Sequence, residues 1–335
     1  VAVFVSSTRV QCLVPPSTTM SENTISSVAV SVTTNGLRFS TTHATFEYVS
    51  APSIVILSPP VSHVGVATSV HVKGVFPLMS PTLMCYFGVR SSPATFINST
   101  SVVCSVPVEE LTAAREYDLR VSSNGGIDMS NALSFTVYER PIITGLTPRR
   151  GAISGGTILR IYGSKFVNTS KVYCKFGSIH SAATFVTSTE ILCTAPHCIG
   201  CRSPAAVHVE MTINGQDFTR DFATFTYTHV PTVSFIEPTR ATITSSALIS
   251  VHGYNFVDSS NLKCRFFNET EILVVFARWR TSEWIDCSSP DVNITGLMNL
   301  TVTNNGYEYS SEILSLSYVE RATVTSLNPA TGPIT

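Results

Sequence analysis

Apolar and polar residues alternate in short runs along the whole chain, and four of these runs meet an Asn-Gly pair. Such a pair favours a hairpin because both residues tolerate the positive φ that a tight turn requires. The four pairs follow one another at intervals of 89, 90 and 91 residues: Asn35-Gly36, Asn124-Gly125, Asn214-Gly215 and Asn305-Gly306. A hairpin that returns at a nearly fixed interval indicates a tandem array of similar domains.

A second repeated segment gives the expected domain boundaries. Its inner proline recurs at the same three intervals, at Pro59, Pro148, Pro238 and Pro329. We therefore expect three complete units, at 51–139, 140–229 and 230–320. Residues 1–50 read as the C-terminal half of an earlier unit and residues 321–335 as the start of a further one, so we expect a longer protein.

The alternation within each unit has the period of two residues that is typical of half-buried β-strands. In the unit 140–229, Leu159 and Ile161 alternate with polar neighbours, and Val172, Cys174 and Phe176 fall on one strand face. No segment shows an apolar stripe of helical period. About seven short strands per unit predict an all-β protein made of tandem immunoglobulin-like β-sandwiches.

The nine cysteines fit this arrangement. Each complete unit has two cysteines in the inward register of their strands, and we expect them to form disulfides rather than reduced core thiols. The expected pairs are Cys85 with Cys104, Cys174 with Cys193, and Cys264 with Cys287. Disulfides in every unit favour an oxidising compartment. Cys12 is expected to pair with a cysteine that precedes residue 1.

Cys198 and Cys201 form a C-x-x-C motif next to His197. A zinc site would need two further ligands at a defined spacing, and a thioredoxin-like redox motif would need a βαβ context. Neither is present in the sequence, so we expect a short local disulfide between these two cysteines.

The repeated motifs resemble the IPT/TIG family. Residues 141–228 carry the pattern best, with Gly151, Gly155-Gly156, Gly163 and Phe166 in place, whereas the other two units have "VSHVGVATS" and "ATITSSA" where the glycine pair should stand. The resemblance implies an immunoglobulin-like sandwich of the E-set type. Such modules occur in cell-surface receptors similar to plexins, in fibrocystin-like ectodomains, in Rel-type transcription factors and beside some bacterial glycosidases.

Composition restricts the partners. Charged residues make up 13% of the chain and the formal net charge is −1, which argues against nucleic acid or an anionic membrane as the main partner. A Rel-type DNA-binding role would predict a basic patch and free cysteines. No run of 18 apolar residues is present, so we expect no membrane insertion in this segment.

Five Asn-x-Ser/Thr motifs are candidate sites of N-linked glycosylation. Their number is close to what chance would give in a chain so rich in serine and threonine, so the count alone proves nothing. Asn299 falls in an outward register and Asn268 replaces a turn glycine, so a glycan at either would avoid the core. The five candidates are Asn98, Asn168, Asn268, Asn293 and Asn299.

Both tryptophans lie in the segment "FARWRTSEW" at 276–284, where the third complete unit has four extra residues between its cysteines. We expect Arg278, Trp279, Arg280 and Trp284 to contact a partner, because exposed tryptophan and arginine are favoured at interfaces. The register places Trp284 outward. The alternative is a loop that folds back on its own domain.

The sequence offers no catalytic machinery. It has no nucleophile elbow, no H-E-x-x-H and no phosphate-binding glycine loop, and the expected domain junctions lack the acidic clusters of interdomain calcium sites. We therefore expect no catalytic residue, no cofactor and no metal, and a protein that is not an enzyme.

Together these observations predict a non-catalytic segment of a large extracellular or cell-surface glycoprotein that serves in adhesion, recognition or assembly into a fibrous appendage or coat. Its expected partners are other protein chains and N-linked glycans. Short, glycine-free linkers with Pro52, Pro141 and Pro231 predict an elongated, semi-rigid array. The alternatives are accessory carbohydrate-binding modules of a secreted enzyme and DNA-binding Rel-type domains.

Overall fold

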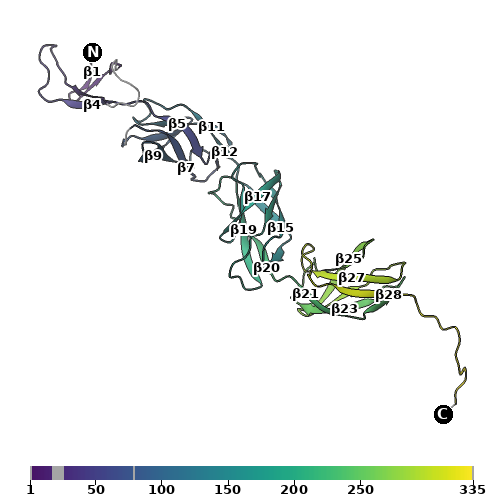
Figure 1. Ribbon diagram of the computed structural model, residues 1–335. Coiled ribbons are helices and arrows are strands. Elements are labelled where there is room, and N and C mark those ends of the chain that lie inside the picture. Colours follow the sequence, from purple (N-terminus) through teal and green to yellow (C-terminus); the bar gives the residue numbers. More distant parts are fainter. Residues whose placement is uncertain (1, 17–25, 78–79, 334–335) are drawn as a thin grey trace. The chain divides into compact units, whose positions relative to one another are not determined.

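The computed structural model describes residues 2–16, 26–77 and 80–333 (Figure 1). Strands are the regular elements of this part of the chain, and no helix occurs in it, so no helix there could cross a membrane. The all-β architecture that the alternation predicts is confirmed. The chain divides into two compact units, Val1–Arg140 and Pro141–Thr335, which are described in turn.

The first compact unit begins with two antiparallel pairs of strands. β1 (Ala2–Ser6) pairs with β2 (Arg9–Cys12), and β3 (Ser26–Val30) pairs with β4 (Ala44–Tyr48). Cys12 is exposed and has no disulfide partner among the described residues.

An eight-stranded arrangement follows in the same unit, with the order β5-β7-β10-β9-β8-β11-β12-β6. We call it the first domain. Strand β9 pairs with β10 through one half and with β8 through the other, and so passes from one layer of a sandwich to the next. The strands are β5 (Ser53–Ser58), β6 (Val61–His63), β7 (Ser69–Val75), β8 (Met84–Phe87), β9 (Arg90–Asn98), β10 (Ser101–Ser105), β11 (Arg115–Ser122) and β12 (Leu133–Tyr138).

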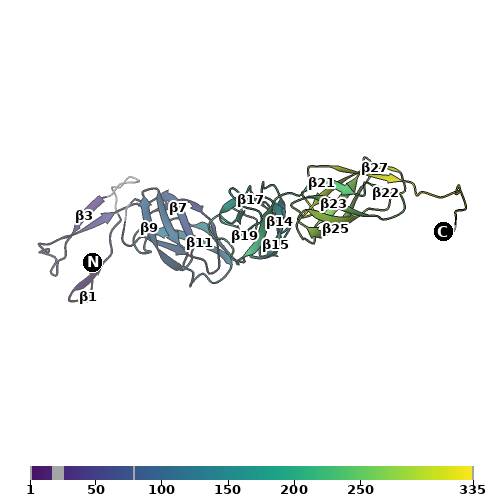
Figure 2. The ribbon, with the colours of Figure 1, turned by 90° about the horizontal axis from the view of Figure 1, so that it is seen from below.

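The second compact unit contains the same arrangement twice, and we call its two sandwiches the second and third domains (Figure 1 and Figure 2). The second domain consists of β13 (Ile142–Thr147), β14 (Arg150–Ala152), β15 (Ile158–Ser164), β16 (Tyr173–Phe176), β17 (Ile179–Thr187), β18 (Glu190–Thr194), β19 (Ala205–Thr212) and β20 (Ala223–Thr228). The third domain consists of β21 (Thr232–Glu237), β22 (Arg240–Thr242), β23 (Leu248–Tyr254), β24 (Lys263–Phe267), β25 (Ile272–Thr281), β26 (Trp284–Ser288), β27 (Gly296–Thr303) and β28 (Leu314–Val319).

Alternate side chains of these strands fill the space between the layers. In the third domain Val251, Ile285 and Leu300 come from three strands and are completely buried in one cluster. Each such side chain contributes about 1.5–3 kcal/mol through removal of apolar surface from water. The residues that alternate with these core positions along each strand point away from the cluster, and some of them, such as Asp286, are buried in the outward face.

One disulfide crosses between the layers in each domain. In the first domain it joins β8 to β10, the strands on either side of β9 in sequence, and the other two domains have the equivalent bond. The Cα atoms of the paired cysteines are 5.8–6.3 Å apart. The pairs are Cys85–Cys104, Cys174–Cys193 and Cys264–Cys287. A fourth disulfide, Cys198–Cys201, closes a short loop in the second domain.

The Asn-Gly pairs turn the chain as expected, but the loops around them are longer than a two-residue hairpin. In the third domain β27 ends at Thr303 and β28 begins at Leu314. The backbone N–H groups of Tyr307 and Glu308 donate to Asn305 Oδ1 at 3.0 and 3.1 Å, and Gly306 has a φ of 82°. The side chain of the asparagine therefore replaces the cross-strand bonds that a tight hairpin would use.

We predict that replacing Cys264 and Cys287 with alanine lowers the free energy of unfolding of the third domain by about 3 kcal/mol, because the unfolded chain regains the entropy of a loop of about 20 residues. The midpoint of thermal unfolding should fall on the order of 15 °C. Both tryptophans lie in this domain, so intrinsic fluorescence follows its unfolding selectively. The matched change of Cys198 and Cys201 should leave that signal unaltered, and an unaltered midpoint in the first variant would contradict the assignment.

Candidate functional site

Three aromatic rings form a row on the outward face of the third domain. Phe235 on β21 lies opposite His252 on β23, which lies opposite Trp284 on β26. The ring centroids of Phe235 and His252 are 4.4 Å apart with planes 10° from parallel, and those of His252 and Trp284 are 5.9 Å apart at 12°. Phe235 and Trp284 keep 53% and 39% of their surface exposed, so the row forms an apolar strip open to solvent.

A buried carboxylate supports this row from the next outward position of β26. Arg280 Nε donates to Asp286 Oδ2 at 2.7 Å, and the indole N–H of Trp284 donates to Asp286 Oδ1 at 3.0 Å. The hydroxyl of Ser250 donates to the same Oδ1 at 3.2 Å. Because Asp286 is bonded from three sides, the position of the Trp284 ring is fixed.

Burial acts to raise the pKa of Asp286, but its environment reverses that effect. The hydrogen bond and the positive charge of Arg280, with the bonds from Ser250 and Trp284, hold the pKa of the carboxyl below its usual range. Asp286 is therefore ionised at neutral pH, and Arg280 neutralises it within the face.

The residues expected to contact a partner divide into two groups. Trp284 and Arg278 point outward, and Arg278 has no ion pair among the described residues. The indole N–H of Trp279 donates instead to the carbonyl of Phe256 at 3.2 Å, and Arg280 is occupied by Asp286. Trp279, Arg280 and Trp284 each bond within their own domain, and contact of the four residues with a partner stays a prediction.

Phe235 and His252 were not expected at this site. A comparison of the residues at equivalent strand positions in the three domains identifies them. The corresponding cross-strand row reads Ile56, Lys73 and Ser101 in the first domain, and Gly145, Tyr162 and Glu190 in the second. Among the three equivalent rows of the described chain, stacked rings occur in the third domain alone.

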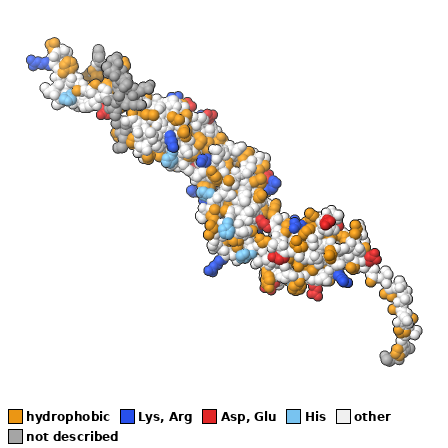
Figure 3. All heavy atoms as spheres, viewed as in Figure 1, with side chains coloured by type: hydrophobic (Ala, Val, Ile, Leu, Met, Phe, Trp, Pro, Cys, Tyr) orange, Lys and Arg blue, Asp and Glu red, His pale blue; other side chains and the backbone are white. Residues whose placement is uncertain are grey.

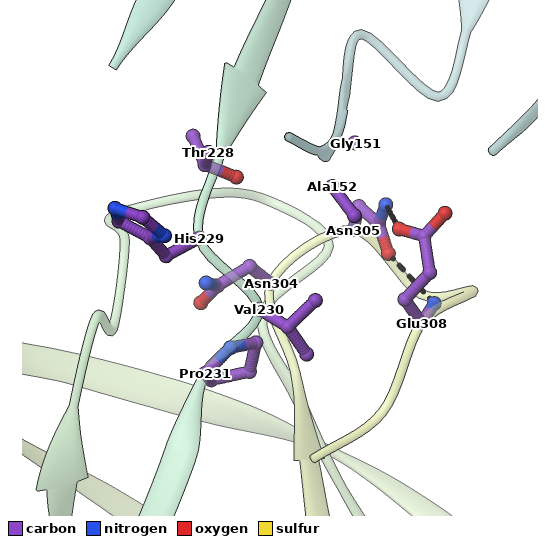
Figure 4. A pocket seen from close by; sticks show the side chains of 9 residues that line it. All are labelled: Gly151, Ala152, Thr228, His229, Val230, Pro231, Asn304, Asn305 and Glu308. Atoms are coloured by element: carbon purple, nitrogen blue, oxygen red, sulfur yellow. Dashed lines mark hydrogen bonds between the residues drawn. The ribbon is translucent and has the colours of Figure 1, made fainter. Parts of the chain in front are cut away.

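A second candidate site is the junction of the two domains in the second compact unit (Figure 4). The side-chain amide of Asn305 donates from Nδ2 to the backbone carbonyl of Arg150 in the second domain at 2.9 Å. The same amide donates to the carboxylate of Glu308, which holds its orientation. The Asn-Gly turn of one domain thus bonds directly to the domain before it.

Two features restrict movement at this junction. Asn304 is buried, accepts a bond from the backbone N–H of Val257 at 3.0 Å and donates to the carbonyl of Asn255 at 2.7 Å, so the turn is tied to its own domain. In the linker that follows Thr228, Pro231 is buried and has a fixed φ.

The glycosylation candidates lie in turns and at outward positions. Asn98 and Asn268 each accept bonds from the residue two positions later, Thr100 or Thr270, in exposed turns. Asn168 and Asn293 are exposed in connections between strands, and Asn299 is half-buried on β27. Glycosylation at these positions stays a prediction.

The described residues contain no cluster of three metal-ligating side chains, and Cys198 and Cys201 are joined to each other. Figure 3 shows hydrophobic side chains scattered over the visible surface with isolated charges between them. No extended basic patch appears on that face.

A family model described as "IPT/TIG domain" matches residues 141–227 and 231–318, which are the second and third domains. The chain belongs to the IPT/TIG domain family. The first domain lies outside the matched residues.

Individual relatives point the same way. Human fibrocystin-L is 30% identical over 115 residues, which cover 33% of this chain, and human plexin-A3 is 26% identical over 213 residues, which cover 56%. The match spans 3% of fibrocystin-L and 11% of plexin-A3. A solved structure of the full extracellular region of plexin A4 aligns with 80% of this chain and 24% of its own, at 16% identity and a TM-score of 0.43.

We predict that Arg280→Met lowers the free energy of unfolding of the third domain by about 1–3 kcal/mol at pH 7, because it leaves a buried carboxylate unpaired. The folded-state pKa of Asp286 is lowered, so the stabilisation is complete above about pH 4 and is lost as the pH falls through the folded-state pKa. Denaturation followed by tryptophan fluorescence at pH 7 and pH 3 measures the difference.

Arg160→Met in the second domain is the matched control, since Arg160 pairs with Glu190 at an exposed site. It should cost less than about 1 kcal/mol, measured by calorimetry. A loss for Arg280→Met that is equal at both pH values would show that packing, rather than the charge pair, sets its cost.

We also predict that Asn305→Ala broadens the distribution of distances between spin labels placed on the second and third domains. The variant loses the bond to the Arg150 carbonyl, a contribution of about 1 kcal/mol. Asn124→Ala removes the equivalent turn side chain from the first domain and should leave that distribution unchanged. Equal distributions in the wild type and in Asn305→Ala would show that the bond does not restrain the junction.

Proposed function

We propose that this chain is a non-catalytic interaction segment of a larger extracellular or cell-surface glycoprotein. Its sandwiches would form a stiff, extended array that presents selected faces to other proteins, in adhesion, recognition or assembly into a fibrous coat. Membership of the IPT/TIG family supports the sandwich fold of each domain, whereas the role of the domains in contact with other proteins is our proposal.

The extracellular part of the proposal rests on the disulfides. Four occur among the described residues, and three of them occupy equivalent positions in successive domains. Disulfides of this kind persist in oxidising compartments and are rare in the cytosol. The relatives point in the same direction, since the aligned plexin A4 structure is titled as an extracellular region.

The bond between Asn305 and the Arg150 carbonyl supports a stiff connection between the second and third domains. A flexible string of domains needs glycine- and serine-rich spacers of some length. The linker between β20 and β21 has three residues and includes the buried Pro231. A short linker with a direct interdomain hydrogen bond supports a nearly constant relation between these two domains.

The surface chemistry of the third domain supports the non-catalytic part of the proposal. The carboxylate with the most constrained environment, Asp286, is neutralised by Arg280 and supports a tryptophan. The rings of the aromatic row stack face to face, so each of them has at least one ring face against a neighbouring ring. A carbohydrate-binding platform needs open ring faces, and this arrangement therefore favours a protein partner.

Small-angle scattering of the whole chain, secreted from animal cells, tests the array. We predict that a single extended arrangement of domains fits the data and that Asn305→Ala widens the ensemble needed to fit them. Asn124→Ala serves as the control. A wild-type profile that requires a broad range of interdomain angles would contradict the proposal.

A further inference from the structure

The outward face of the third domain carries a second cross-strand row beside the aromatic one. Glu237 on β21 lies opposite Ser250 on β23, and Ser250 lies opposite Asp286 on β26. Asp286 in turn lies opposite Arg278 on β25. The row therefore begins with a negative side chain and ends with a positive one.

The two ends of this row differ from its middle. Glu237 and Arg278 are exposed, and neither belongs to an ion pair in the part of the chain that the structure describes. Asp286, between them, is buried and already neutralised by Arg280. Each end of the row thus offers one uncompensated charge, and the two charges have opposite signs.

This pattern is self-complementary. Consider a second copy laid face to face on the first, related to it by a two-fold axis. The axis runs parallel to the strands and passes between β23 and β26. This rotation places β21 of each copy over β25 of the other. Glu237 of each copy then meets Arg278 of the other, so the dimer has two opposite-charge pairs and each of the four charges is compensated once. The same rotation places His252 of each copy over Trp284 of the other, and apolar surface covers apolar surface.

We infer that the third domain binds a second copy of this chain through the outward face of β21, β23, β26 and β25. The inference rests on the proposed function as an interaction segment and names the partner. A two-fold interface uses the same patch on both copies, so the patch must be complementary to itself. The opposite charges at the two ends of the row meet this requirement. The aromatic strip supplies the apolar centre and the two ion pairs set the register.

The glycosylation candidates leave this face uncovered. In the third domain Asn268 lies in the turn between β24 and β25, Asn293 in the connection before β27, and Asn299 on β27. None of the three lies on the outward face of β21, β23 or β26. Glycans at these positions would cover the other layer of the sandwich and leave the aromatic face available.

The equivalent rows in the other domains lack the charge pattern. In the second domain the row reads Thr147, Arg160, Leu192 and Thr184, and in the first domain it reads Ser58, His71, Val103 and Thr95. Neither row has opposite charges at its two ends. The self-complementary face is therefore specific to the third domain within the described chain, although all three domains share one scaffold.

Sedimentation equilibrium of the whole secreted chain tests the inference. We expect a weak dimer with a Kd on the order of 10 µM, because one four-stranded face lies at the small end of interface sizes. Glu237→Arg and Arg278→Glu, each alone, should raise the Kd at least about tenfold, since each places two like-charged pairs in the homodimer. Thr184→Glu, at the position in the second domain that corresponds to Arg278, should leave the Kd unchanged.

Mixing the two single variants gives the decisive result. A heterodimer of Glu237→Arg with Arg278→Glu has two opposite-charge pairs, so the mixture should dimerise with a Kd within about threefold of the wild type. This recovery also shows that both variants are folded. A wild-type chain that stays monomeric at about 100 µM, or a mixture that stays monomeric, would overturn the inference. Either result would leave the scattering test of the stiff array unaffected.

Discussion

Each domain depends on the burial of alternate side chains between two layers that one disulfide joins. A domain of about 90 residues has a small core, so most inward positions must be apolar and one cross-link adds a large part of the net stability. In the third domain this constraint fixes Val251, Ile285 and Cys287 at the centre. It leaves the positions between them unconstrained on the solvent side.

That freedom explains how one repeated scaffold carries different surfaces. The register places Ile56, Gly145 and Phe235 at one equivalent outward position, and nothing in the core distinguishes them. In the third domain the outward positions of neighbouring strands are filled by rings that stack and by a carboxylate that holds them. The surface has thus become specific while the core kept its pattern.

The sequence predicted the fold well because the signals for it are local and repeated. Alternation and the recurring Asn-Gly pairs indicated tandem immunoglobulin-like sandwiches, and that fold class is confirmed. The inward register of Cys174 and Cys193 likewise indicated the pair that the structure joins. Such features need only the spacing of residues along one chain.

The candidate sites were harder to predict because they depend on pairing between strands and between domains. The stack of Phe235, His252 and Trp284 requires a bulge in β21 that shifts Phe235 into register. Trp279 lies opposite Ile285 just before a bulge in β25, and its indole N–H donates to the carbonyl of Phe256 in its own domain, a contact that spacing alone does not reveal. The bond from Asn305 reaches a carbonyl 155 residues earlier, and no local pattern encodes it.

All three domains present an equivalent outward sheet face, and by our proposal the third domain alone uses it for contact. Carbene footprinting of the whole chain over a range of concentrations tests this directly. We expect that labelling of Phe235 and Trp284 decreases as the concentration rises, while labelling of the equivalent Ile56 and Tyr162 stays constant. Constant labelling of all four residues, or an equal decrease at all four, would contradict it.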